Sequence, residues 1–259
     1  MRPSISRRTL RLLWGTAVAL SILGIVIGLE RTYIQFKGEI RETRVLTPRE
    51  QRKLTLVSPP SMAQGTARYE NFAAGTIDLE AKYERNRSLI LRHVVPGVLI
   101  LLLAPLQFSG LIRRRWLPYH RWAGRLILIA VWICGSAALA FGLLVPFGGT
   151  PERVMTAIFG SLFLYFPGRG WRAIREGNVA QHREWMLRMY GLALAVALIR
   201  IIGALLVWLT PVGVREGFNW SFWGGFSLML VLTEIWIRRT RAIHRPPAMQ
   251  YQAIATDIL

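Results

Sequence analysis

Cysteine, lysine and acidic residues are scarce in this sequence. Among its 259 residues Cys134 is the single cysteine, so neither an intrachain disulfide nor a CxxC metal or redox motif exists. Only three of the 33 basic residues are lysines, and 14 acidic residues leave a formal net charge of +19. Walker, GxSxG and HExxH motifs and paired carboxylates within apolar runs are also absent. These absences argue against hydrolases and against proton-driven transporters of the usual kind.

Long apolar runs dominate what is present. Hydrophobic residues make up 53% of the chain, and several runs of about 20 residues can each cross a hydrocarbon core of roughly 30 Å. The basic residues cluster at the ends of these runs, which is a membrane topology signal rather than a sign of nucleic-acid binding. The sequence therefore predicts an all-α polytopic membrane bundle whose partners are membrane lipids and not nucleic acid.

We expect six transmembrane helices, arranged in four parts of the chain. The six spans run over about 12–29, 88–108, 118–145, 152–166, 178–209 and 218–237, and the fourth is short unless it continues towards Arg175. The parts are a basic tail with the first span (1–29), a polar extracytoplasmic segment (30–87), a four-helix core (88–209), and the sixth span with its tail (210–259).

The polar segment of residues 30–87 has its own helix signals. Thr47 is followed by Pro48 and, three residues after the Thr, by Glu50, which is a typical helix start. Residues 76–87 predict a second short helix that leads into the next span. A small subdomain over the bundle and a poorly ordered loop both fit this segment.

Flanking arginines predict the orientation. The two tails and the loops after the second and fourth spans carry 18 Arg or Lys residues near span ends, whereas the two short opposite loops carry only Arg153 and Arg215. Positive residues stay on the cytoplasmic side. We therefore expect a bacterial inner-membrane protein with both termini in the cytoplasm.

The fifth span is the most informative stretch. It begins near His182 and carries Arg200 deep inside an apolar run, where a charge costs roughly 2.5 to 3.5 kcal/mol. Eighteen residues make five helical turns, so Arg200 lies on the same face as His182. We expect this face to point into the protein, because lipid offers a guanidinium no partner.

Two His-Arg boxes lie at the predicted cytoplasmic ends of the third and fifth spans. Because His120 and His182 then share a depth, a haem b held edge-on between the two helices is one interpretation. The candidate cofactor-binding residues are His120, His182, Arg121, Arg183, Arg125 and Arg188, and the two histidines are metal ligands only if the metal is haem iron. Lipid head-group anchoring, with Trp122 and Trp185 in an aromatic belt, is the alternative.

The boxes also end two similar units. Residues 106–110 (LQFSG) lead to His120-Arg121, and residues 164–168 (LYFPG) lead to His182-Arg183. This weak internal repeat suggests two parallel copies of a helical hairpin within the core.

A second candidate site lies in the opposite half of the predicted bundle. Arg92, His93 and Arg200 are expected within reach of one another, where they would bind a carboxylate, a phosphate or a haem propionate. The alternative is that Arg200 bonds to backbone carbonyls freed near Pro96. Glu234 is expected to form an ion pair with Arg238 one turn away, or to reach another helix.

The boxes resemble a bacterial family of predicted multi-pass membrane proteins known as domain of unknown function 2306. The likeness covers about residues 89–200. It rests on His93, His120, Arg121, Gly124, Arg125, His182, Arg183, Trp185, Met186, Arg188 and Arg200. This resemblance implies no established activity. A looser likeness to the cytochrome b561 type implies transmembrane electron transfer, but three membrane histidines rather than four allow at most one bis-histidine haem.

Function stays open between classes at this point. The leading hypothesis is a haem-binding or redox-linked membrane protein that uses His120 and His182. Its catalytic residues are unknown, and the sequence leaves open whether the protein is an enzyme. A non-enzymatic lipid- or anion-binding scaffold or sensor is the competing class, and a small-molecule carrier is the third. A homo-oligomer or a redox partner fits each of them.

Overall fold

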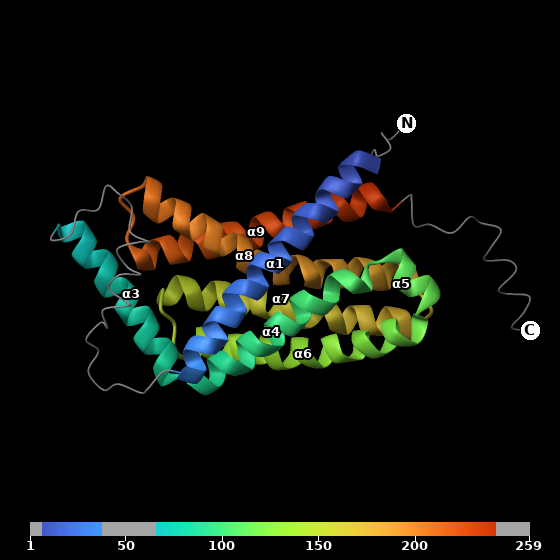
Figure 1. The fold of residues 1–259 in the computed structure, drawn as a ribbon, viewed down its shortest axis with the longest axis horizontal. Coiled ribbons are helices and arrows are strands. Elements are labelled where there is room, and N and C mark those ends of the chain that lie inside the picture. The colour runs from blue at the N-terminus through green and yellow to red at the C-terminus, as the bar shows by residue number, and fades with distance from the viewer. Residues whose placement is uncertain (1–6, 38–65, 242–259) are drawn as a thin grey trace, which may run out of the picture.

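The computed structural model describes residues 7–37 and 66–241, and every element in these ranges is a helix (Figure 1). The helix predicted to start at Thr47 lies outside the described residues. The helices are α1 (Arg7–Lys37), α3 (Ala67–Arg85), α4 (Arg87–Gln107), α5 (Gly110–Arg115), α6 (Leu117–Leu144), α7 (Thr150–Arg175), α8 (Val179–Leu209) and α9 (Val214–Thr240). The all-α prediction is confirmed for the described residues.

Five of these helices are long and apolar enough to cross a membrane: α1, α4, α6, α8 and α9. The predicted fourth span, α7, does not reach this standard. Between Arg153 and Arg169 it has only fifteen uncharged residues, fewer than the roughly 20 that a span needs. It does continue through Pro167 to Arg175 and runs alongside α6 and α8 in the bundle (Figure 1).

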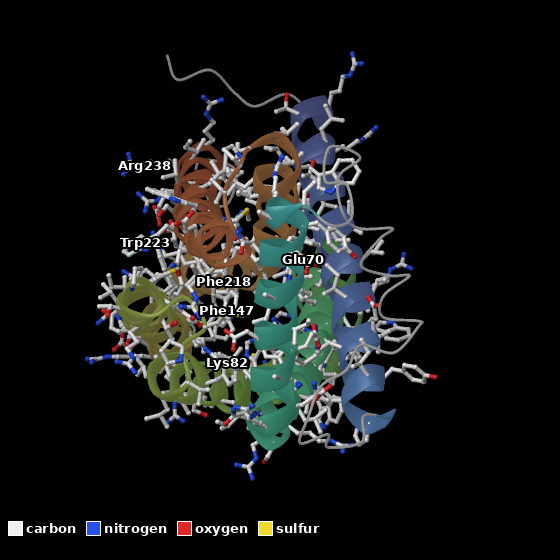
Figure 2. All side chains as sticks on the ribbon, turned by 90° about the vertical axis from the view of Figure 1, so that its left-hand side faces the viewer. Glu70, Lys82, Phe147, Phe218, Trp223 and Arg238 are labelled. Carbon is white, nitrogen blue, oxygen red and sulfur yellow. The ribbon has the colours of Figure 1, made fainter. Side chains whose placement is uncertain are left out.

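The bundle has two ends that differ in character. One end of the bundle holds the first residues of α1, α6 and α8 and the last residues of α9, and we call it the His-Arg end (Figure 1). The helix α3 lies across the other, which we call the α3 end (Figure 2). The helix pairs α4–α6 and α7–α8 are both in close contact, so the two halves of the predicted repeat are both antiparallel pairs.

The helix α3 begins earlier than the sequence predicts. It starts at Ala67 rather than at Thr76, because the Thr66 hydroxyl accepts a hydrogen bond from the Tyr69 backbone N–H and caps the helix. Gly75 is tolerated in its middle because this residue lies against Val214 of α9, where a Cβ would be 2.9 Å from the valine Cβ.

Ion pairs tie α3 to the bundle. Arg31 of α1 donates to both carboxylate oxygens of Glu80, at 2.5 and 2.6 Å. Asp78 accepts from Arg215 of α9 at 3.3 Å and lies 3.7 Å from Lys82. Figure 2 shows Lys82 next to Phe147, whose ring lies 5.6 Å from the ammonium. This end of the bundle is therefore closed by matched charges.

A second set of ion pairs joins α8 to α9 and corrects one prediction. Glu234 pairs with Arg188 of α8, and not with Arg238 in its own helix as the spacing predicts. Glu184 accepts two hydrogen bonds from Arg241, at 2.7 and 2.8 Å. The interhelical partner is preferred because Arg188 is largely buried and has to pair, whereas Arg238 is exposed and hydrated.

Candidate functional site

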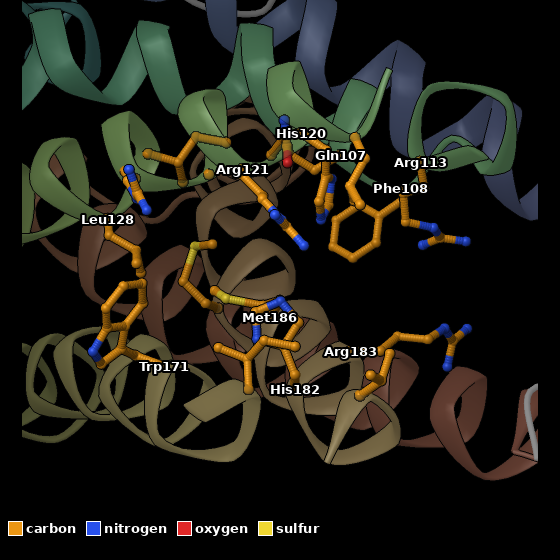
Figure 3. A pocket seen from close by; sticks show the side chains of 18 of the residues that line it. Gln107, Phe108, Arg113, His120, Arg121, Leu128, Trp171, His182, Arg183 and Met186 are labelled. Atoms are coloured by element: carbon orange, nitrogen blue, oxygen red, sulfur yellow. The ribbon is translucent and has the colours of Figure 1, made fainter. Parts of the chain in front are cut away.

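A cavity of about 930 Å³ opens between α6 and α8 at the His-Arg end (Figure 3). Its volume lies inside the roughly 300 to 1,000 Å³ that is typical of small-molecule sites. The walls are mostly apolar and include Phe108, Ile127, Leu128, Trp171, Ile174, Met186 and Met189. No aspartate or glutamate is among the described residues that line it.

Both histidines of the His-Arg boxes line this cavity. His120 comes from the first turn of α6 and His182 from the first turn of α8, so they approach from two different helices (Figure 3). The repeated box thus places two imidazoles at one end of the bundle. Of the other predicted cofactor-binding residues, Arg121, Arg125 and Arg183 also line the cavity.

His182 is held by the backbone of α7. Its Nδ1 lies 2.8 Å from the carbonyl oxygen of Gly170, and because a carbonyl only accepts, Nδ1 carries the proton. In the neutral ring Nε2 then keeps a lone pair for a ligand. The close spacing of the helices at this point is set by Gly170, where a Cβ would meet the Met186 sulfur at 3.2 Å.

His120 has no such support. Its Nδ1 is buried and makes no hydrogen bond, and the amide nitrogen of Gln107, which lines the same cavity, is also buried without a partner. Buried polar atoms are almost always satisfied in native proteins. Two unsatisfied atoms in one cavity therefore indicate a place where a ligand or water supplies the missing bonds.

The cavity is strongly cationic. Arg113, Arg121 and Arg125 make no ion pair with any described residue, and Arg113 stands within electrostatic range of both His120 and Arg183. Arg183 donates to the Thr240 hydroxyl at 3.0 Å, which leaves its charge unneutralised. An apolar cavity with a guanidinium rim and no lining carboxylate suits an amphiphilic anion.

Arg188 was predicted to bind a cofactor, and its position is different. It does not line the cavity but pairs with Glu234 of α9 and lies 3.9 Å from Glu184. Six residues from His182 amount to 600° of rotation, so its side chain leaves α8 about 120° away from the imidazole. Helix geometry therefore assigns Arg188 to the contact between α8 and α9.

The second predicted site is not assembled as expected. Arg92 is exposed, whereas His93 turns towards α6 and donates from Nδ1 to the Cys134 carbonyl at 3.1 Å, with the thiol sulfur at 3.3 Å. None of Arg92, His93 and Arg200 lines the cavity, so they are not placed to hold a haem propionate there. Binding of another anion stays a prediction.

The expectation that Arg200 points into the protein is wrong. The residue is exposed, and it makes no hydrogen bond or ion pair with a described residue, although His93 lies within its electrostatic range. The outer half of α8 packs on α9 through Ile199 and Gly203, which leaves the neighbouring face uncovered. Only the half of this face near His182 is covered by the bundle.

Residues 90–237 match the family described as predicted membrane protein (DUF2306). The match covers more than half of the chain. The protein belongs to this family. No curated protein and no solved structure matches the chain.

The family match contains the whole cavity but not every helix. It includes His93, His120, His182 and Arg200, whereas α1 and α3 lie outside it. The residues that line the cavity therefore all lie within the matched range, and α1 and α3 pack against helices inside it. The description of the family names no activity.

Several residues of the site were not predicted. Gln107, Arg113 and Trp171 line the cavity although no motif singles them out. Gln107 had one usable signal, since it is a polar residue in the last turn of an apolar helix and belongs to the repeated unit before His120. The contact between His93 and Cys134 had none, because it depends on the register of α4 against α6.

Proposed function

We propose that this membrane protein binds haem b in the cavity between α6 and α8, where His120 and His182 would hold it. The observation that carries the proposal is that the imidazoles of the two His-Arg boxes line one apolar cavity. When bound, haem supplies one-electron transfer and small-ligand binding at its iron. The proposal includes no catalytic residue beyond these ligands.

The donor set fits this group. Neutral imidazole is a usual haem ligand, and the hydrogen bond from His182 to Gly170 leaves its Nε2 free to ligate. A cavity of about 930 Å³ is far larger than a single metal ion needs, and its apolar walls suit a flat macrocycle. The unpartnered Nδ1 of His120 adds a polar atom that a ligand or its water satisfies.

The arginines at the rim suit the two carboxylates of haem. Guanidinium groups bind carboxylates through paired charge-assisted hydrogen bonds. Because Arg113, Arg121 and Arg125 have no acidic partner among the described residues, a bound carboxylate costs no existing ion pair. In this proposal they take the role that the sequence analysis considered for Arg92, His93 and Arg200.

The proposal also includes an orientation. The arginines near span ends gather at the His-Arg end, and this supports an orientation with the cavity and both chain termini on the cytoplasmic side of a bacterial inner membrane. A reporter fused after Leu259 tests this. Activity only outside the cytoplasm would reverse the orientation.

An absorbance spectrum tests haem binding directly. The protein is expressed with a haem supply, purified in detergent and compared with the His120→Ala/His182→Ala double variant. We expect a Soret band in the wild type that the double variant lacks. His244→Ala removes a histidine of the tail and is the matched control, which keeps the band.

Two results would overturn the haem proposal. One is a wild-type protein without a Soret band after reconstitution with haem. The other is stoichiometric copper without haem, since the Met186 and Met189 thioethers beside two imidazoles also suit Cu(I).

A lipid- or anion-binding scaffold is the second candidate, and the unpaired guanidiniums of the rim favour it. Mass spectrometry of the purified protein separates the two functions. Bound anionic lipid in a protein that takes up no haem, and whose lipid content falls when Arg113, Arg121 and Arg125 are replaced by glutamine, would establish the scaffold instead.

A further inference from the structure

The two imidazoles of the cavity differ in what holds them. His182 donates its Nδ1 proton to the Gly170 carbonyl, whereas the Nδ1 of His120 has no hydrogen-bond partner among the described residues. A hydrogen bond of this kind fixes the tautomer and the ring orientation and makes the other nitrogen a better ligand. Only one of the two histidines is therefore oriented before a ligand arrives.

The helix start that carries His182 is also better fixed than the one that carries His120. The side chain of Asn178 caps α8 by accepting from the Gln181 backbone N–H at 3.0 Å. At the start of α6, Trp116 occupies the N-cap position and provides no side-chain hydrogen bond. An N-cap contributes about 1 kcal/mol to a helix end, so the first turn of α6, which carries His120, opens more easily.

The surroundings of His120 leave room for movement. The Gln107 side chain stands beside Gly124, one turn beyond His120, where a Cβ would lie 3.7 Å from the Gln107 amide oxygen. The amide nitrogen of Gln107 is unsatisfied too, so this side of the cavity offers polar groups without fixed partners. Rotation of the His120 ring breaks no hydrogen bond.

We infer that His182 is the permanent ligand and His120 the exchangeable one, so that a small exogenous donor takes the His120 position. This inference rests on the proposed haem function. The class of ligand is a small σ-donor or diatomic molecule that enters from the α6 side of the cavity. The protein then binds such a molecule at its haem site and is not limited to holding a closed bis-histidine centre.

Single variants test the asymmetry. Because second-shell support is worth about 10- to 100-fold in metal affinity, we expect His182→Ala to weaken haem binding by that factor more than His120→Ala does. The His120→Ala protein keeps haem with the spectrum of a five-coordinate iron, and added imidazole restores the six-coordinate spectrum. Haem titration and thermal unfolding of each purified variant supply the affinity and the folding control.

The wild-type protein provides a second test that needs no variant to fold. Carbon monoxide added to the reduced, haem-loaded protein is expected to bind and to shift the Soret band, because it displaces His120. Asn178→Ala is the companion variant, since loss of the α8 cap lowers the affinity for haem and narrows the difference between the two histidines.

Different experimental results would contradict the proposed haem binding and the inferred difference between the two histidines. A wild-type protein without haem removes the proposed function, and the inference with it. Haem that binds with equal dependence on both histidines, or with the greater dependence on His120, overturns the inference alone. The same holds if the reduced wild-type protein binds haem but no carbon monoxide.

Discussion

The α3 end and the cavity at the His-Arg end differ in how their charged side chains are paired. At the α3 end Arg31 forms a bidentate ion pair with Glu80, and Asp78 forms ion pairs with both Arg215 and Lys82. In the cavity the guanidiniums face apolar walls and one another, without a lining carboxylate. The first arrangement fixes a helix across the bundle. The second arrangement leaves positive charges without lining carboxylates, which lowers stability. Proteins keep such unbalanced charge mainly at functional sites, where a ligand supplies the opposite charge.

Both ends carry arginine, so residue type alone does not separate them. The difference lies in the partners: α3 contributes acidic side chains to one end, whereas α5 and the first turns of α6 bring three arginines in succession and more beyond them. On the α3 side Arg31, Lys82 and Arg215 lie against carboxylates. Arg68 of α3 instead donates to the backbone carbonyls of Val207 and Thr210, and its Nε is buried without a hydrogen bond. Charge in the cavity stays available for a ligand.

The largest effect is expected from removing the charge of the cavity. Arg113→Gln, Arg121→Gln and Arg125→Gln together remove three guanidiniums of the lining that form no ion pair with a described residue. Each charge-assisted hydrogen bond to a ligand carboxylate is worth about 1.5 to 3 kcal/mol, so haem affinity falls by tenfold or more in a titration. The unfolding temperature does not fall, because no internal ion pair is broken.

Arg114→Gln and Arg115→Gln are the matched controls for this triple variant. They remove two exposed arginines of α5, the helix that carries Arg113, and these two residues do not line the cavity. Their haem affinity is expected to equal that of the wild type. If the controls lose as much affinity as the triple variant, general surface charge and not the cavity attracts the ligand, and the contrast between the two ends disappears.

The opposite outcome is expected at the α3 end. Arg31→Gln removes the charge and the paired hydrogen bonds that Glu80 accepts from Arg31, at a site where both side chains are about four-fifths buried, at 17% and 21% exposure. The loss of a charge-assisted hydrogen bond destabilises the fold by about 2 kcal/mol, and haem affinity is unchanged. Thermal unfolding in detergent measures the first effect and a haem titration the second.

A charge swap sharpens this second test. The double variant Arg31→Glu/Glu80→Arg restores opposite charges and is expected to recover part of the lost stability. A loss of haem affinity in Arg31→Gln without a loss of stability would show that α3 acts on the cavity, and that the two ends are not independent.

The sequence predicts much of this architecture, for identifiable reasons. The ends of α4, α6, α8 and α9 agree with the predicted spans within about four residues, because Pro118, Pro146 and the basic clusters interrupt the apolar runs. The helices α1 and α7 end eight and nine residues beyond the predicted 29 and 166. The shared cavity of His120 and His182 follows from the similarity of their boxes. Predictions of this type depend only on local pattern, and they succeed for that reason.

The predictions that failed needed information about neighbouring helices. The exposure of Arg200 depends on how the outer half of α8 packs on α9, and periodicity says only which residues share its face. The partner of Glu234 depends on Arg188 being buried beside it, whereas the sequence offers Arg238 at an ideal local spacing. The hydrogen bond from His182 to Gly170 could not be predicted either, because it depends on how α7 packs against α8. The difference between the two histidines rests on this bond.

The smallest effect concerns the contact between α8 and α9, which joins the two ends. A Cβ on Gly225 would lie 2.5 Å from the Cγ1 of Ile199 and 3.4 Å from its backbone N and Cα. The close contact is the one with Cγ1, and because the χ1 angle of a β-branched residue is stiff in a helix, Gly225→Ala overpacks this contact and destabilises the fold by about 1 kcal/mol net. Gly224→Ala meets no atom within 4 Å and is the control, which gains helix propensity and stabilises by up to about 1 kcal/mol.

These two neighbouring substitutions also distinguish effects on the stability of the helix packing from effects on haem binding in the cavity. Ile199 lies 17 residues beyond His182, about 25 Å along α8, so neither variant is expected to change haem affinity. Paired unfolding curves and haem titrations give all four values. Equal unfolding temperatures for the two variants would contradict this prediction, because they would show that α9 can shift along α8. A helix that shifts in this way cannot hold Thr240 in its hydrogen bond with Arg183 at the rim of the cavity.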